Sequence, residues 1–140
     1  MTIQDVLLPL LVQVALTFVL GFWMAALRVQ AIRSRVVHSR DVALREPNWP
    51  RRILQVQHAY HNQLELPVLF YVLTILAWIT KTADLLFVLL AWVFVVFRVI
   101  HAWIHVTDNN MPRRGMVFIA SAVVLCVMWV IFGIHIVIGR

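Results

Sequence analysis

The chain has 140 residues, of which 63% are apolar and 13% charged, with a mean hydropathy of +0.90. Soluble domains have roughly 45–50% apolar and about 25% charged residues, so this composition excludes both an ordinary soluble domain and intrinsic disorder. Twelve Lys and Arg against six Asp and Glu give a formal net charge of +6, which in so apolar a chain indicates charged ends facing lipid headgroups and no nucleic-acid partner.

Four stretches of the chain carry at most one formal charge each and are long enough for a transmembrane helix, which needs roughly 20 apolar residues. Glu65 is the charge within the second stretch, and Arg98 is the charge within the third. Apolar side chains occupy all faces of these stretches, as helices in lipid require. The sequence therefore predicts one all-α domain over residues 1–140, an integral membrane four-helix bundle with spans at about 6–27, 53–80, 85–107 and 115–139.

Basic residues predict the orientation of this bundle. The connection after the first span carries seven arginines, whereas the connection after the second span offers only Lys81 and Asp84. By the positive-inside rule, the first and third connections are cytoplasmic and both termini lie on the non-cytoplasmic side. The opening residues 1–5 contain no Lys or Arg, and the apolar run after them is long, so we expect a retained helix and not a cleaved signal peptide.

Polar side chains follow one face of the second span. His58, His61, Asn62 and Glu65 have spacings that form a continuous stripe on a helix, at about 100° per residue. An ionised side chain at the centre of a span costs roughly 2.5–3.5 kcal/mol when it faces lipid. We therefore expect this stripe to face the interior of the bundle.

A second stripe is predicted on the third span. Arg98, His101 and His105 fall on one helix face, and Asn109 and Arg114 continue the polar path toward the cytoplasmic end. Adjacent antiparallel helices can bring the two stripes together. So many polar groups, opening toward an arginine-rich end, predict a polar ligand.

Several explanations for these polar groups remain open. A buried ion pair between Glu65 and Arg98, with histidines as hydrogen-bonding partners, uses only some of them. A di-iron site is disfavoured because the spans supply one glutamate and no Glu-x-x-His motif. Haem held by one histidine from each span would make the protein an electron carrier. An anionic, zwitterionic ligand uses all the groups, because carboxylates accept ammonium groups and arginines bind carboxylates in forked pairs.

Two runs of the sequence carry a resemblance to a known family. One is Asn62-Gln-Leu-Glu65-Leu-Pro67-Val-Leu-Phe70-Tyr71, and the other is Arg98-Val-Ile-His101-Ala-Trp-Ile-His105, followed by Asn109 and Arg114. With the number and lengths of the spans, they resemble the MAPEG proteins (membrane-associated proteins in eicosanoid and glutathione metabolism), particularly the short bacterial members. The resemblance implies a four-helix bundle in the bacterial inner membrane, assembled as a homotrimer that binds glutathione between neighbouring subunits near the cytoplasmic side.

The resemblance also implies roles for individual residues. Asn62 and Glu65 match the glutathione-binding pair of the family, and Arg28 matches a basic residue that reaches a glutathione carboxylate. Arg114 matches the arginine near the glutathione sulfur, where a guanidinium favours the thiolate over a thiol whose unperturbed pKa is about 8.5. The polar stripes and the resemblance together predict the ligand-binding residues Arg28, His58, His61, Asn62, Glu65, Arg98, His101 and His105, with Arg114 as the catalytic residue.

At four positions the chain differs from the mammalian branch of the family. His58 and His61 stand where that branch has arginines, and His105 and Phe118 stand where it has tyrosines. The first hypothesis is a transferase or peroxidase that uses glutathione as co-substrate against a small lipophilic electrophile entering from the membrane lipids. The differences keep open a second hypothesis, a non-catalytic protein of the same fold that binds glutathione or a lipophile. A haem-binding electron carrier is the third, and we expect no metal site.

Overall fold

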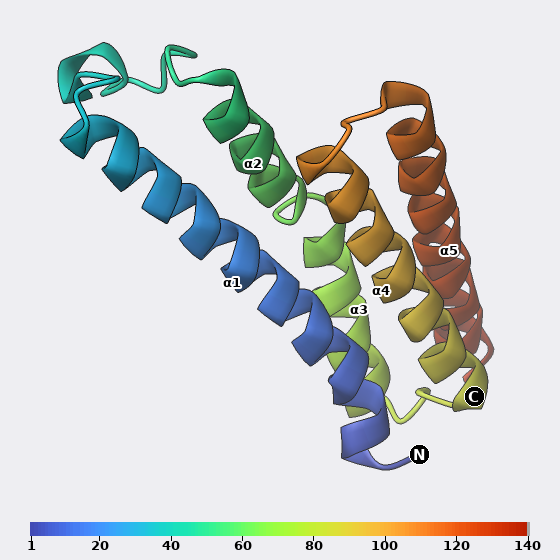
Figure 1. Ribbon diagram of the computed structural model, residues 1–140. Coiled ribbons are helices and arrows are strands. Elements are labelled where there is room, and N and C mark those ends of the chain that lie inside the picture. Colours follow the sequence, from blue (N-terminus) through green and yellow to red (C-terminus); the bar gives the residue numbers. More distant parts are fainter. Residues whose placement is uncertain (140) are drawn as a thin grey trace.

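The computed structural model describes residues 1–139, which form helices and connections without a strand. Figure 1 shows the long helices running alternately up and down, with the connections 34–50 and 107–110 at one end. The start of the first helix and the end of the last lie at the opposite end. The elements are α1 (Ile3–Arg33), η1 (Ser39–Asp41), α2 (Arg51–Asn62), α3 (Leu66–Ile79), α4 (Leu85–Val106) and α5 (Met111–Ile138).

Four helical segments are long and apolar enough to cross a membrane: α1, α2 together with α3, α4, and α5. This confirms the prediction of an all-helical chain with four candidate spans. The helix ends differ from the predicted span ends, since α1 continues to Arg33 and α5 already begins at Met111. Arginine is a good helix former, so a charge that ends an apolar run does not end a helix. The start of α5 is set by Asn110, whose side chain accepts a hydrogen bond from the backbone N–H of Arg113.

The second span is not one continuous helix, contrary to the prediction for residues 53–80. Between α2 and α3, Gln63, Leu64 and Glu65 leave the helical path. Pro67 lies in the first turn of α3, where its missing N–H is tolerated. In a continuous helix its ring would clash with the carbonyl of Gln63, four residues earlier. The break leaves backbone carbonyls at the end of α2 that need donors within the bundle.

Helix α4 packs against α1, α2 and α5. Away from the connections 34–50 and 107–110, Phe70 of α3, Phe94 of α4 and Met128 of α5 belong to one buried apolar cluster. A second cluster near those connections joins α1, α2 and α4 and includes Val56 and Ala102. The second cluster holds α2 beside the end of α4, which is where the polar residues gather.

Gly21 allows α1 and α2 to approach closely. A Cβ atom at Gly21 would lie 3.0 Å from Cε2 of Tyr60 on α2, so a larger side chain must displace the ring. We expect Gly21→Leu to lower the free energy of unfolding by about 1–2 kcal/mol, because overpacking strains a close contact and this ring is only half-buried. Thermal unfolding in detergent measures the change. Gly133→Leu is the control, since nothing lies within 4 Å of its Cβ, and equal stabilities of the two variants would contradict the close contact.

Candidate functional site

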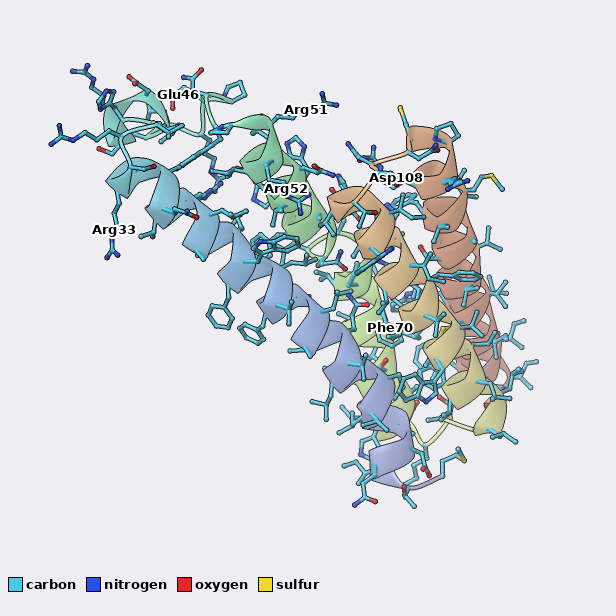
Figure 2. The ribbon with its side chains drawn as sticks, in the orientation of Figure 1. Arg33, Glu46, Arg51, Arg52, Phe70 and Asp108 are labelled. Atoms are coloured by element: carbon cyan, nitrogen blue, oxygen red, sulfur yellow. The ribbon has the colours of Figure 1, made fainter. Side chains whose placement is uncertain are left out.

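A polar cavity of about 690 Å³ opens at the end of the bundle that carries the connections 34–50 and 107–110. Figure 2 shows two of its lining residues at this end, Arg51 at the start of α2 and Asp108 after α4. The cavity also contains predicted site residues from three helices and the break in the second span, namely His58, His61, Asn62, Glu65, His105 and Arg114. The two polar stripes predicted from the sequence therefore meet at one cavity.

The break changes how Glu65 reaches this cavity. His58, His61 and Asn62 lie on α2, whereas Glu65 follows the break as the residue that precedes α3. The predicted continuous stripe of four residues therefore ends at Asn62. Glu65 is exposed and still lines the cavity, at the positive N-terminal end of α3.

Two side chains of α2 fix it against the end of α4. The Gln55 Nε2 donates to the carbonyls of His105, at 2.8 Å, and Thr107, at 3.0 Å. The Arg52 Nη1 donates to the carbonyl of Val106. Carbonyls in the last turn of a helix have no partner within that helix, so these bonds satisfy the end of α4 and hold the wall of the cavity in place. Gln55 was missed by the sequence analysis, although its position one turn before His58 continues the polar stripe.

The start of α5 forms the basic corner of the cavity. Asn109 has a φ of 51°, a left-handed conformation that asparagine tolerates, and its Oδ1 accepts a hydrogen bond from the Arg114 Nη1. The first turn of α5 contains no acidic side chain. The guanidinium of Arg114 and the positive end of the helix dipole therefore act together, and this corner favours an anion.

Arg98 lies deeper in the bundle than the cavity and is 0% exposed. Its Nη2 donates to the backbone carbonyl of Asn62 at 2.9 Å, to the Asn62 Oδ1, and to the Gln63 Oε1 at 3.4 Å. Among residues 1–139 no ion pair joins Arg98 to Glu65, contrary to one explanation considered for the sequence. Arg98 instead neutralises the negative C-terminal end of α2, which the break creates.

His101 and Arg28 also lie outside the cavity. His101 is 2% exposed, and its ring packs against those of His105 and Phe118 at centroid distances of 5.7 Å and 5.8 Å. Arg28 donates to the Gln57 Oε1, and its guanidinium lies 5.0 Å from the ring centroid of Trp49. Six of the predicted residues thus line the cavity, whereas Arg98 and His101 lie behind it in contact with Asn62 and His105, and Arg28 does not line it.

A buried pair of glutamines extends the polar network to α1. The Gln13 Nε2 donates to the Gln63 Oε1 at 2.9 Å, and both residues are 0% exposed. This contact links α1, the break and Arg98, and the sequence analysis did not predict it. Within residues 1–139, no group of three or more His, Cys, Asp or Glu side chains is arranged to hold a metal ion.

Comparison with known proteins adds one finding to this geometry. The family model described as MAPEG family matches residues 6–134, a range that includes the four candidate spans in large part and every residue of the cavity. No curated protein and no solved structure matches the chain.

Proposed function

This chain belongs to the MAPEG family, and from that premise we propose that it transfers glutathione to a lipophilic electrophile. Its four apolar helices make it a multi-pass integral membrane protein, and members of the family generally use glutathione. The observation that carries the proposal is the single cavity that gathers polar side chains from α2, the break, α4 and α5.

The chemistry of the cavity suits this tripeptide. Glutathione carries one ammonium group, two carboxylates and a thiol. Glu65 offers a carboxylate to the ammonium group, and Arg51 and Arg114 offer guanidinium groups to anions. A volume of about 690 Å³ lies within the usual range of roughly 300–1,000 Å³ for small-molecule sites.

In the proposed mechanism, Arg114 and the positive end of α5 stabilise the glutathione thiolate. The thiol proton passes to water in the cavity, which the basic corner favours by lowering the energy of the anion. The thiolate attacks an electrophilic carbon, a sulfur–carbon bond forms, and the leaving group departs with the electrons of the bond that breaks. With a lipid hydroperoxide the thiolate attacks the terminal oxygen instead, the O–O bond breaks, and the alkoxide leaves and takes up a proton to become the alcohol. A second glutathione then displaces the hydroxyl of the resulting sulfenic acid, which gives the disulfide and water.

The proposal includes a homotrimer in a bacterial inner membrane, with the cavity at the cytoplasmic face. Arg28 supports it, because this residue lies on α1 outside the cavity of its own chain. In such a trimer, Arg28 would be available to a ligand carboxylate bound between neighbouring copies. The seven arginines between positions 28 and 52 support the cytoplasmic orientation of that end.

Replacing Glu65 tests the assigned ligand. Isothermal titration of the detergent-solubilised chain with glutathione is expected to show binding, and Glu65→Gln is expected to weaken it about tenfold. The loss is moderate because Glu65 is exposed and water screens its charge. Glu46→Gln is the matched control, since Glu46 accepts a hydrogen bond from the Leu44 N–H in the connection and does not line the cavity. Unchanged affinity in Glu65→Gln would remove Glu65 from the proposed site.

Binding without catalysis is the second candidate function. The observation that favours it is the pair His105 and Phe118, neither of which offers a hydroxyl to a thiolate. The Phe118 ring is instead packed against His101. An assay of conjugation with a chromogenic electrophile distinguishes the two functions, because a protein that only binds would take up glutathione without forming the conjugate.

A further inference from the structure

The buried Arg98 controls which way the side-chain amide of Asn62 faces. Arg98 is 0% exposed, and its Nη2 is bonded to both the backbone carbonyl and the side-chain Oδ1 of Asn62. A guanidinium carries only donors, so the atom that faces it must be the amide oxygen and not the amide nitrogen. The nitrogen Nδ2 is therefore turned away from Arg98.

Asn62 also borders the cavity. Asn62 is half-buried and lines the cavity, while its Oδ1 and backbone carbonyl are both occupied by Arg98. No hydrogen bond joins Nδ2 to another side chain or carbonyl in residues 1–139. With its oxygen held by Arg98, the side-chain amide of Asn62 has its N–H donors left for a partner in the cavity.

A reversed amide is strongly disfavoured. Reversal would bring the Asn62 NH₂ against the guanidinium, donor against donor, and remove an acceptor from a charge that is fully buried. Two nitrogens of Arg98, Nε and Nη1, already lack a partner among the described residues. A buried charged group that loses one more partner pays a desolvation cost, so the orientation is fixed before any ligand arrives.

We infer that Arg98 is a positioning residue that fixes the side-chain amide of Asn62 as a hydrogen-bond donor. At this point the cavity would therefore bind a ligand oxygen, from a carboxylate or a peptide carbonyl. The inference rests on the proposed function for the identity of the ligand. It narrows the role of Asn62, which by its chemistry alone pairs with a donor or an acceptor. Arg98 acts on the ligand only through Asn62, because it does not line the cavity.

The variant Asn62→Asp tests the donor directly. A carboxylate keeps an oxygen toward Arg98 but has no N–H to offer the cavity. We expect the affinity for glutathione to fall by about tenfold or more, while the midpoint of thermal unfolding rises because Arg98 gains a buried counter-charge. A purely structural role would move stability and affinity in the same direction. Asn110→Asp is the control for charge, because aspartate is an equally good N-cap and this residue does not line the cavity.

Variants of Arg98 test the positioning. Arg98→Lys retains a charged donor for Oδ1 and is expected to bind glutathione within about threefold of wild type, whereas Arg98→Gln can face Asn62 with either end of its amide and is expected to lose about tenfold. The inference would be overturned if Asn62→Asp and Asn110→Asp both bound glutathione with wild-type affinity. This holds even if Arg98→Gln fails to fold. Absence of binding by the wild type would overturn the proposed function instead. In that case an unchanged or lowered unfolding midpoint in Asn62→Asp would still refute the contact with Arg98.

Discussion

Replacing Arg114 by alanine is expected to lower kcat for conjugation of a chromogenic electrophile about 100- to 1,000-fold at pH 7, the usual loss when one group that stabilises a reacting anion is removed. Arg114 lines the cavity at the start of α5, and its Nη1 is held by the Asn109 Oδ1. Without it, the start of α5 offers the sulfur only the positive end of the helix dipole. The measurement is initial rate at saturating glutathione, so that weakened binding does not contribute.

The neighbouring arginine provides the control. Arg113 belongs to the same helical turn but pairs with Asp108 at 3.8 Å and does not line the cavity, so Arg113→Ala should stay within about twofold of wild type, as surface substitutions usually do. A second readout is pH. A free thiol has a pKa of about 8.5, so the deficit of Arg114→Ala should shrink as the pH approaches about 9. A deficit that stays constant with pH would show that Arg114 does not act by stabilising the thiolate.

Replacing Gln63 by leucine is expected to lower the free energy of unfolding by about 2–4 kcal/mol. The substitution removes an acceptor from both Gln13 and Arg98. Because both of these residues are 0% exposed, no water replaces the lost bonds. Thermal and denaturant unfolding in detergent or nanodiscs measure the change.

A double variant separates the glutamine pair from the rest of the network. Gln13→Leu combined with Gln63→Leu removes both partners of the 2.9 Å hydrogen bond and leaves neither amide unpaired. We expect the double variant to be more stable than Gln63→Leu alone, with a coupling of about 0.6 kcal/mol and at most about 1.7 kcal/mol, the mean and the maximum found for hydrogen bonds between membrane helices. Strictly additive effects would show that the two amides do not interact.

The four spans and the family could be predicted from the sequence, for related reasons. Uninterrupted apolar runs are a strong signal because lipid admits few charges, and the same constraint makes Glu65 and Arg98 conspicuous within their spans. The sequence also predicted that the two polar stripes meet, because helical spacing and antiparallel neighbouring helices suffice to align them. The residues concerned are His58, His61 and Asn62 on one side and His105 and Arg114 on the other. The match to the MAPEG family over residues 6–134 confirms the resemblance drawn from two short runs.

The break between α2 and α3 could not be read from charge or hydropathy. Its local cause is Pro67, but a proline in the middle of an apolar run is also compatible with a kinked helix. The partner of Arg98 stayed open for the same reason, since an unbroken helix offers no free carbonyls and leaves Glu65 as one candidate among several. The hydrogen bond between Gln13 and Gln63 could not be predicted, because a count of formal charges within the spans does not include neutral amide side chains.

The broken second span bears on how the chain enters the membrane. It is the least apolar of the four candidate spans, and the carbonyl at its break is satisfied by Arg98 from α4. In lipid, neither the open end of α2 nor the guanidinium has an alternative partner. We therefore expect the second and third spans to insert together as a hairpin. The carbonyl at the break of the second span finds its donor in Arg98 of the third, so a chain interrupted between residues 80 and 84 would leave that carbonyl without a partner.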